Sequence, residues 1–92
     1  MQYVVVIEPA APENPDFGVL IPDLPGCFAQ GATLEEALTD AEASAELWLE
    51  VWFRDERDAP KASTEEDLRA QHPEWADWLW SRIAVDVSNI RR

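Results

Sequence analysis

The chain has 92 residues, of which 47% are hydrophobic, and a formal net charge of −12 from 19 Asp and Glu against 7 Lys and Arg. Its length fits one small domain, and its hydrophobic fraction excludes a disordered acidic tail. Its charge argues against direct binding of nucleic acid or anionic lipid, because both depend on Lys and Arg.

The first third of the chain predicts an antiparallel meander of three strands. Residues 2–8 (QYVVVIE) are β-branched or aromatic on both faces, which predicts a central strand. Prolines make residues 9–16 a loop. Two shorter strands are predicted at residues 17–21 and 27–30.

A rigid turn separates the second and third strands. Pro22 ends the second strand because proline donates no ladder hydrogen bond, and Pro25 fixes the reversal. Gly26 can take a backbone conformation closed to other residues. Gly31 is expected to supply a bend before the next element.

A long helix is predicted from residue 34 to about residue 53. Thr33 precedes it and Glu36 follows three residues later, which is the capping-box spacing. Apolar residues at spacings of three and four define a stripe that is expected to face the core: Leu34, Leu38, Ala41, Ala45, Trp48 and Trp52.

Two further sets of residues lie outside this stripe. Leu47 and Val51 lie about 100° or more from its centre, so they are expected to make a second contact, with the C-terminal third or with another chain. The other set is a solvated negative face: Glu35, Glu42, Glu46 and Glu50.

The C-terminal third predicts a short helix and a last strand. Ser63 or Thr64 begins a helix that runs to about residue 71, and Pro73 closes it. Residues 74–82 fit a helical turn or a strand that already starts at Trp80. Alternation predicts a strand at residues 83–87: Ile83, Val85 and Val87 on one face, and Ala84, Asp86 and Ser88 on the other.

This order of elements, β-β-β-α-α-β, predicts an α+β fold in which the long helix covers one face of a sheet of about four strands. The other sheet face is partly apolar and has no obvious cover in so short a chain. An uncovered apolar face or edge strand favours dimerisation.

The negative charge is concentrated in one half of the chain. Residues 1–53 hold ten acids and no Lys or Arg, which gives −10, whereas residues 54–92 hold nine acids and all seven bases, which gives −2. Such a field raises the association rate of a basic partner. A solvated acidic surface explains the same residues.

The sequence also predicts a cytoplasmic protein. The one cysteine, Cys27, excludes an intrachain disulfide. The apolar run at residues 3–7 is too short for a signal peptide and lacks its basic start, and no stretch approaches the ~20 apolar residues that cross a bilayer.

Residues with catalytic chemistry are sparse. His72 has no base or nucleophile beside it, and Cys27 is expected to be an inert buried thiol. We therefore predict no enzyme, no catalytic or metal site and no cofactor. The alternative is a metal-dependent nuclease, which would draw on dispersed carboxylates: Glu8, Asp16, Asp23 and Asp86.

Three tryptophans lie within six residues near the C-terminus. Trp75, Trp78 and Trp80 carry more aromatic area than a short element buries in itself. They either roof the core, which we favour, or form an anchor patch for a partner.

One segment is much more specific than the rest. Residues 21–38 (IPDLPGCFAQGATLEEAL) resemble the signature of the HicB family of antitoxins. The opening strand, the long helix, Pro60 and the closing IAVDVS segment also occupy family positions, so the resemblance covers residues 2–88. It implies a partial RNase H-like fold and an antitoxin of a type II toxin–antitoxin pair. Such antitoxins bind a small basic mRNA-cleaving toxin of the HicA type and block its catalytic histidine.

Many family members continue into a DNA-binding segment, whereas this sequence stops five residues after Val87. We therefore expect a single HicB-like domain over residues 1–92, without a C-terminal DNA-binding domain and without binding of nucleic acid or membranes. We expect it to form a homodimer or larger oligomer and to neutralise a HicA-type toxin. The alternative to the toxin partner is an orphan structural or regulatory module. The residues expected to contact the toxin are Asp23, Glu42, Glu46 and Glu50, with Leu47 and Val51 in an oligomer or packing contact.

Overall fold

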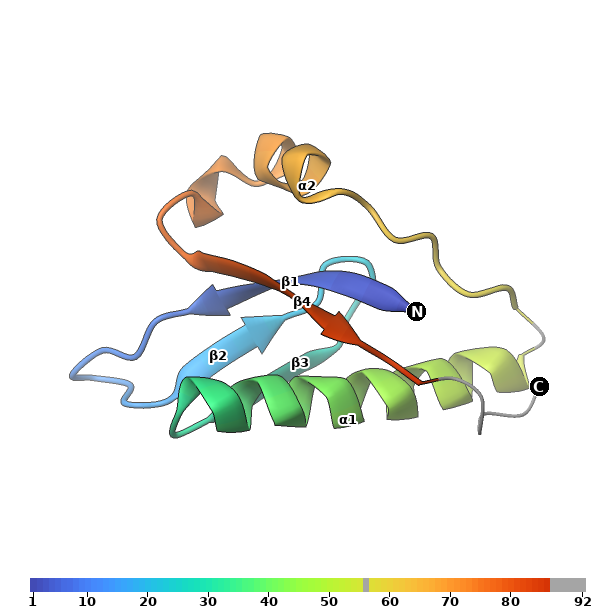
Figure 1. Ribbon diagram of the computed structural model, residues 1–92, viewed down its shortest axis with the longest axis horizontal. Coiled ribbons are helices and arrows are strands. Elements are labelled where there is room, and N and C mark those ends of the chain that lie inside the picture. Colours follow the sequence, from blue (N-terminus) through green and yellow to red (C-terminus); the bar gives the residue numbers. More distant parts are fainter. Residues whose placement is uncertain (56, 87–92) are drawn as a thin grey trace.

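The computed structural model describes residues 1–55 and 57–86. Four strands form one antiparallel sheet in the order β3-β2-β1-β4. The long helix α1 lies along one face of the sheet, and α2 lies on the other side (Figure 1). The predicted α+β fold is therefore confirmed. The elements in chain order are β1 (Gln2–Glu8), β2 (Phe17–Leu20), β3 (Phe28–Gly31), α1 (Leu34–Arg54), α2 (Glu65–Gln71), the 3₁₀ helix η1 (Pro73–Trp75) and β4 (Leu79–Ala84).

Strand β1 is the central strand that its sequence predicts. It pairs with β2 on one side and with β4 on the other. Tyr3, Val5 and Ile7 are buried in the cluster that packs under α1. Val4 and Val6 point to the opposite face and are also buried, which explains why β1 is apolar throughout.

The turn between β2 and β3 is closed by its own backbone. The N–H of Leu24 donates to the carbonyl of Ile21 at 2.9 Å, and the N–H of Cys27 donates to the carbonyl of Leu24 at 2.9 Å. These bonds draw Ile21 and Cys27 out of the strands, so β2 ends and β3 begins one residue inside the predicted limits. Strand β3 also ends one residue later than predicted, at Gly31. Gly26 has φ +81°, the left-handed conformation that its position predicts.

Helix α1 starts where predicted, because the Thr33 hydroxyl accepts the N–H of Glu36 at 3.1 Å. Its core stripe, however, matches the predicted one only in part, since Ala41 and Ala45 are buried as expected. Leu34 is 37% exposed, and Leu38, Trp48 and Trp52 are only half-buried at the margin of the core. The buried residues instead form one row at a spacing of four: Ala37, Ala41, Ala45, Leu49 and Phe53.

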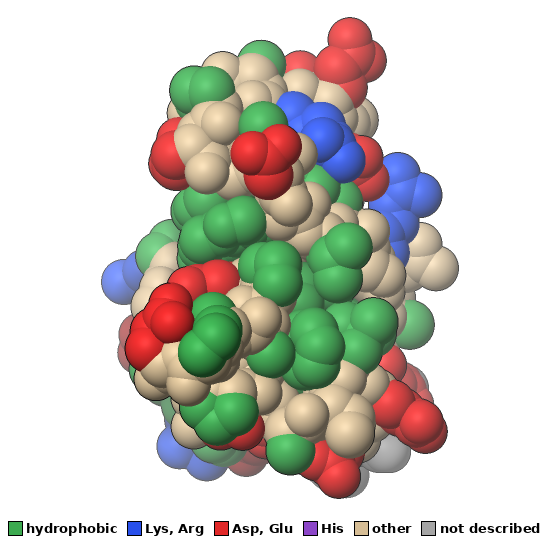
Figure 2. Space-filling view, turned by 90° about the vertical axis from the view of Figure 1, so that its left-hand side faces the viewer, with side chains coloured by type: hydrophobic (Ala, Val, Ile, Leu, Met, Phe, Trp, Pro, Cys, Tyr) green, Lys and Arg blue, Asp and Glu red, His purple; other side chains and the backbone are tan. Residues whose placement is uncertain are grey.

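The physical reason is the geometry of an i, i+4 row. Each step of four residues turns about 40° around a helix, so this row winds obliquely across α1. Its first three members are alanines, which let the helix backbone approach the sheet closely. The larger tryptophans are displaced to the side. Figure 2 views the molecule from the end at which α1 begins, where hydrophobic side chains gather with acidic side chains around them.

The C-terminal third confirms the short helix and corrects the last strand. Thr64 caps α2 by accepting the N–H of Asp67 at 3.1 Å. Strand β4 already begins at Leu79, because six of its residues pair with β1. The prediction of residues 83–87 was therefore wrong at its start, and the alternative of a strand at Trp80 was nearer. Val87 and Ser88 lie outside the described residues.

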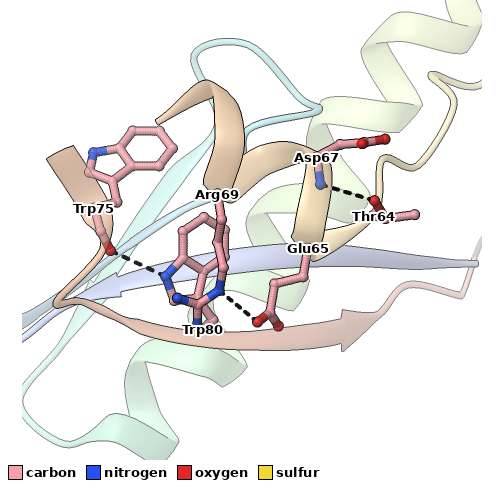
Figure 3. Close-up of polar contacts among 6 residues, drawn as sticks. All are labelled: Thr64, Glu65, Asp67, Arg69, Trp75 and Trp80. Carbon is pink, nitrogen blue, oxygen red and sulfur yellow. Dashed lines mark hydrogen bonds and ion pairs between the residues drawn. The ribbon is translucent and has the colours of Figure 1, made fainter. Parts of the chain in front are cut away.

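The second sheet face is only partly open, which corrects the expectation of an uncovered face. Trp80 lies on it beside Val6, and the guanidinium carbon of Arg69 in α2 lies 4.8 Å from the centre of the Trp80 ring. The Trp80 indole N–H donates to the Trp75 carbonyl at 3.2 Å (Figure 3). Helix α2 and the tryptophans therefore cover the β1–β4 half of this face.

The three C-terminal tryptophans are half-buried rather than part of the main core. Trp75 and Trp78 stack with ring centres 6.0 Å apart, and Trp75 and Trp80 lie 6.4 Å apart in a tilted arrangement. They act as a roof over the second sheet face.

Within the described residues, no helix has the length and hydropathy needed to cross a membrane.

Candidate functional site

The acidic face of α1 is largely exposed. Glu42, Glu46 and Glu50 follow one another at steps of four residues, so their side chains lie on one side of the helix. Glu42 and Glu46 are exposed and Glu50 is half-buried. The Arg54 guanidinium lies 3.1 Å from the Glu50 carboxylate. Arg54 therefore offsets part of the charge at the C-terminal end of this face, and Glu42 and Glu46 carry the rest.

Asp23, the fourth residue expected at the toxin contact, has an internal role. One carboxylate oxygen accepts the backbone N–H of Ser63 at 2.7 Å, and the other accepts the Ser63 hydroxyl at 2.7 Å. These bonds hold the segment before α2 against the β2–β3 turn. Both Asp23 oxygens are therefore engaged within the chain.

The turn that carries Asp23 also lies on a different side of α1 from the glutamates. The Trp48 indole N–H donates to the Pro25 carbonyl at 2.9 Å, so Trp48 marks the side of α1 that faces the turn. At 100° per residue, Trp48 and Glu46 point about 160° apart. The structure thus brings Glu42, Glu46 and Glu50 together but separates them from the turn of Asp23.

An apolar groove lies between α1 and the β2–β3 turn. Its volume is about 510 Å³. Leu47 and Val51, which the sequence places outside the core stripe, line this groove and are 62% and 51% exposed. Most of the surface of both side chains is therefore open to solvent and is not covered by the C-terminal third of the chain. The other residues around the groove are Gly26, Cys27, Phe28, Ser44, Trp48, Trp52 and Asp55.

Sequence reasoning missed most of this groove. Trp48 and Trp52 were assigned to the core stripe, although they lie beside Leu47 and Val51 at the same spacing of four residues. These two adjacent apolar pairs, four residues apart, were the pattern in the sequence that could have predicted the groove. Phe28 is 68% exposed and could not be placed, because its approach to α1 depends on the turn before β3.

Cys27 forms part of the groove wall and is a buried free thiol. Burial raises the pKa of this thiol, because an apolar environment disfavours the thiolate. The neutral form is therefore favoured, which agrees with the expectation of an unreactive cysteine.

His72 takes part in packing and in a local hydrogen bond. Its ring stacks on Trp75 with centres 4.0 Å apart, and its Nδ1 lies 3.1 Å from the Glu74 carboxylate. A hydrogen bond from the Glu74 backbone N–H, and then one from His72, hold the pKa of Glu74 below its ordinary value. In the described part of the chain, no three His, Cys, Asp or Glu side chains come together as a metal site would require.

The comparison with protein families decides the identity of the chain. The family described as "HicB_like antitoxin of bacterial toxin-antitoxin system" matches residues 3–92. The chain belongs to this family. The resemblance seen in the sequence is thereby confirmed.

Similar proteins cover the chain almost completely. It is 32% identical over 90 residues to an uncharacterized 14.9 kDa protein in the rep-hol intergenic region of Haemophilus phage HP1, an alignment that covers 98% of this chain and 65% of that protein. It is also 33% identical over 66 residues to the UPF0150 protein Ta0767 of Thermoplasma acidophilum, covering 72% of this chain and 93% of that protein. The chain thus spans about two thirds of the phage protein.

Solved structures show the same fold. The antitoxin HicB of Burkholderia pseudomallei superposes with a TM-score of 0.79 at 26% identity, over 99% of this chain and 66% of that one. The N-terminal domain of that antitoxin superposes with a TM-score of 0.75 over 94% of this chain and 99% of that domain. A HicA3 and HicB3 toxin–antitoxin complex gives a TM-score of 0.69 at 19% identity, over 94% of this chain and 99% of that one.

Proposed function

We propose that this protein is an antitoxin that binds and neutralises a small basic mRNA-cleaving toxin of the HicA type in the cytoplasm. Membership of the HicB-like antitoxin family is the observation that carries this proposal. The solved HicA3 and HicB3 complex supports it, because a chain of the same fold takes part in a toxin–antitoxin assembly. No cofactor or catalytic step is part of the proposed role.

The acidic face of α1 is the proposed electrostatic contact. Residues 1–53 carry −10 without one Lys or Arg, and this half of the chain includes nearly all of α1. Such a one-signed field steers a basic protein toward the helix and raises its association rate. On this account Glu42, Glu46 and Glu50 bind basic side chains of the toxin, and the bound antitoxin keeps RNA from the toxin's active site.

Reversing the charge of this face tests the assignment. The variant Glu42→Lys/Glu46→Lys/Glu50→Lys should bind the toxin about 100-fold more weakly at low salt, because three attractive charges become repulsive. The measurement is a titration against a HicA-type toxin, with its catalytic histidine replaced, at several salt concentrations. Wild-type affinity should fall as salt rises.

A matched control reverses three acids elsewhere. Glu66, Asp67 and Glu74 are exposed near α2 and lie outside the proposed contact. Their replacement by lysine changes the net charge by the same amount, so it should weaken binding much less. Equal losses in both triple variants would show that only the total charge matters. Wild-type affinity indifferent to salt would contradict the electrostatic contact altogether.

Self-association is proposed alongside toxin binding. Leu34, the first residue of α1, is 37% exposed and offers an apolar contact for it. Sedimentation of the free protein gives the oligomeric state directly.

A further inference from the structure

The apolar groove beside α1 has a rigid floor. The rings of Trp48 and Trp52 stack with centres 4.8 Å apart. Their indole N–H groups donate to the carbonyls of Pro25 at 2.9 Å and of Asp58 at 2.7 Å. Because both rings are fixed by stacking and by a hydrogen bond, the groove exists before any ligand arrives. A preformed site loses little conformational entropy on binding.

The rim of the groove is apolar and unusually exposed. Phe28, Leu47 and Val51 are 68%, 62% and 51% exposed, and they lie around one hollow. Three large apolar side chains gathered at one hollow are typical of an interaction site, whereas single exposed apolar residues are ordinary. The volume of about 510 Å³ has room for side chains of another protein.

Acidic residues continue from the groove along α1. Asp55 lies at one end of the groove. A second hollow lies next to the other end, toward the N-terminus of α1. Ser44 lines the groove and its neighbour Ala43 lines the second hollow, which also contains Glu36 and Asp40. One side of α1 therefore presents an apolar half followed by an acidic half.

This charge pattern discriminates between two kinds of occupant. A second copy docked in this groove would meet Asp55 at one end and Glu36 and Asp40 beyond the other, and residues 1–53 of that copy hold ten acids and no Lys or Arg to pair with them. A basic protein with an apolar anchor would satisfy both halves at once. The basic partner is therefore the favoured occupant.

We propose that the groove holds an apolar side chain of the basic toxin, while basic residues of the toxin lie against Glu36 and Asp40. This inference rests on the proposed function and adds the anchor that charge alone does not provide. Helix α1 is about 10–12 Å across, and Glu46 and Leu47 point about 100° apart on it. One bound protein can therefore contact the acidic face and the groove together.

The test replaces the rim side chains without touching the charges. The double variant Leu47→Ser/Val51→Ser should bind the histidine-replaced toxin about 30-fold more weakly, as expected for the loss of a central apolar contact. The loss should appear mainly in the dissociation rate, with the salt dependence unchanged. Leu79→Ser is the matched control, since Leu79 is 45% exposed on β4. The toxin affinity of this variant should stay within about twofold of the wild-type value.

The outcomes separate this proposal from the proposed function. Wild-type affinity in the double variant, with normal salt dependence, would overturn the groove and leave the antitoxin role intact. Failure of the wild-type protein to bind the toxin would overturn both. If the wild-type protein is a dimer and the double variant is a monomer with unchanged toxin affinity, the groove belongs to a contact with a second copy. If serine at both positions impairs folding, Val51→Thr replaces the double variant, because threonine keeps the shape of the valine side chain. Val51→Thr should also weaken toxin binding.

Discussion

Replacing Gly31 with alanine is expected to destabilise the protein by about 3 kcal/mol, near the upper end of the usual cost of overpacking. A Cβ at this position would lie 2.5 Å from the Ala37 backbone nitrogen and 2.8 Å from the Glu36 carbonyl carbon. Both atoms belong to the backbone of α1, so no side chain can move aside. The strand and the helix would have to separate.

Urea denaturation of Gly31→Ala, compared with that of the control variant Gly18→Ala, measures this effect. Gly18 is also in a strand, but a Cβ there meets only the Glu8 side chain, at 3.8 Å. Its replacement should change the free energy of unfolding by less than about 1 kcal/mol. Equal stability of the two variants would show that β3 and α1 do not pack this closely. Gly31 thus allows the close approach of β3 and α1, a role that the sequence did not predict.

Replacing Asp23 with alanine is expected to cost about 2–3 kcal/mol, because the variant loses two hydrogen bonds to a charged acceptor. The Asp23 carboxylate accepts both the backbone N–H and the hydroxyl of Ser63, each at 2.7 Å. The alanine variant leaves the Ser63 N–H without this acceptor. Thermal unfolding of the purified variant measures the loss.

Two related variants divide this effect between the bonds. Ser63→Ala removes only the hydroxyl bond and should cost about 1 kcal/mol. Asp23→Asn keeps one acceptor oxygen and should lie between wild type and Asp23→Ala. If Asp23→Ala is as stable as wild type, the contact does not hold the segment before α2. Toxin affinity of folded Asp23→Asn tests the separate prediction that Asp23 contacts the partner.

The sequence predicted best those features whose cause is local. The caps at Thr33 and Thr64 depend on residues three positions away, and the positive φ of Gly26 depends on its own turn. The apolar character of β1 on both faces was sufficient to make it central. Each of these is set by a few adjacent residues.

Features set by packing between distant elements were harder to predict. The start of β4 was missed because Ser81, opposite the core residue Val5, interrupts the apolar alternation between Leu79 and Ile83. The buried row of α1 was misplaced because its direction depends on how the helix crosses the sheet. A helical wheel gives the sides of a helix but not that crossing.

The candidate site shows the same division. The row of Glu42, Glu46 and Glu50 follows from helical spacing and was predicted as a unit. The groove joins α1 to Phe28 through the turn before β3, so it needed the folded structure. Asp23 is an acid like the others, and only its bonds to Ser63 reveal its internal role.

Inhibition of toxin activity tests the central claim most directly. A purified HicA-type toxin is mixed with mRNA and with increasing amounts of the protein, and the intact mRNA is measured. We predict that cleavage declines as the antitoxin is added and stops near equimolar amounts, whereas the charge-reversed α1 variant protects poorly. Unchanged cleavage at a large excess of the wild-type protein would contradict the antitoxin role.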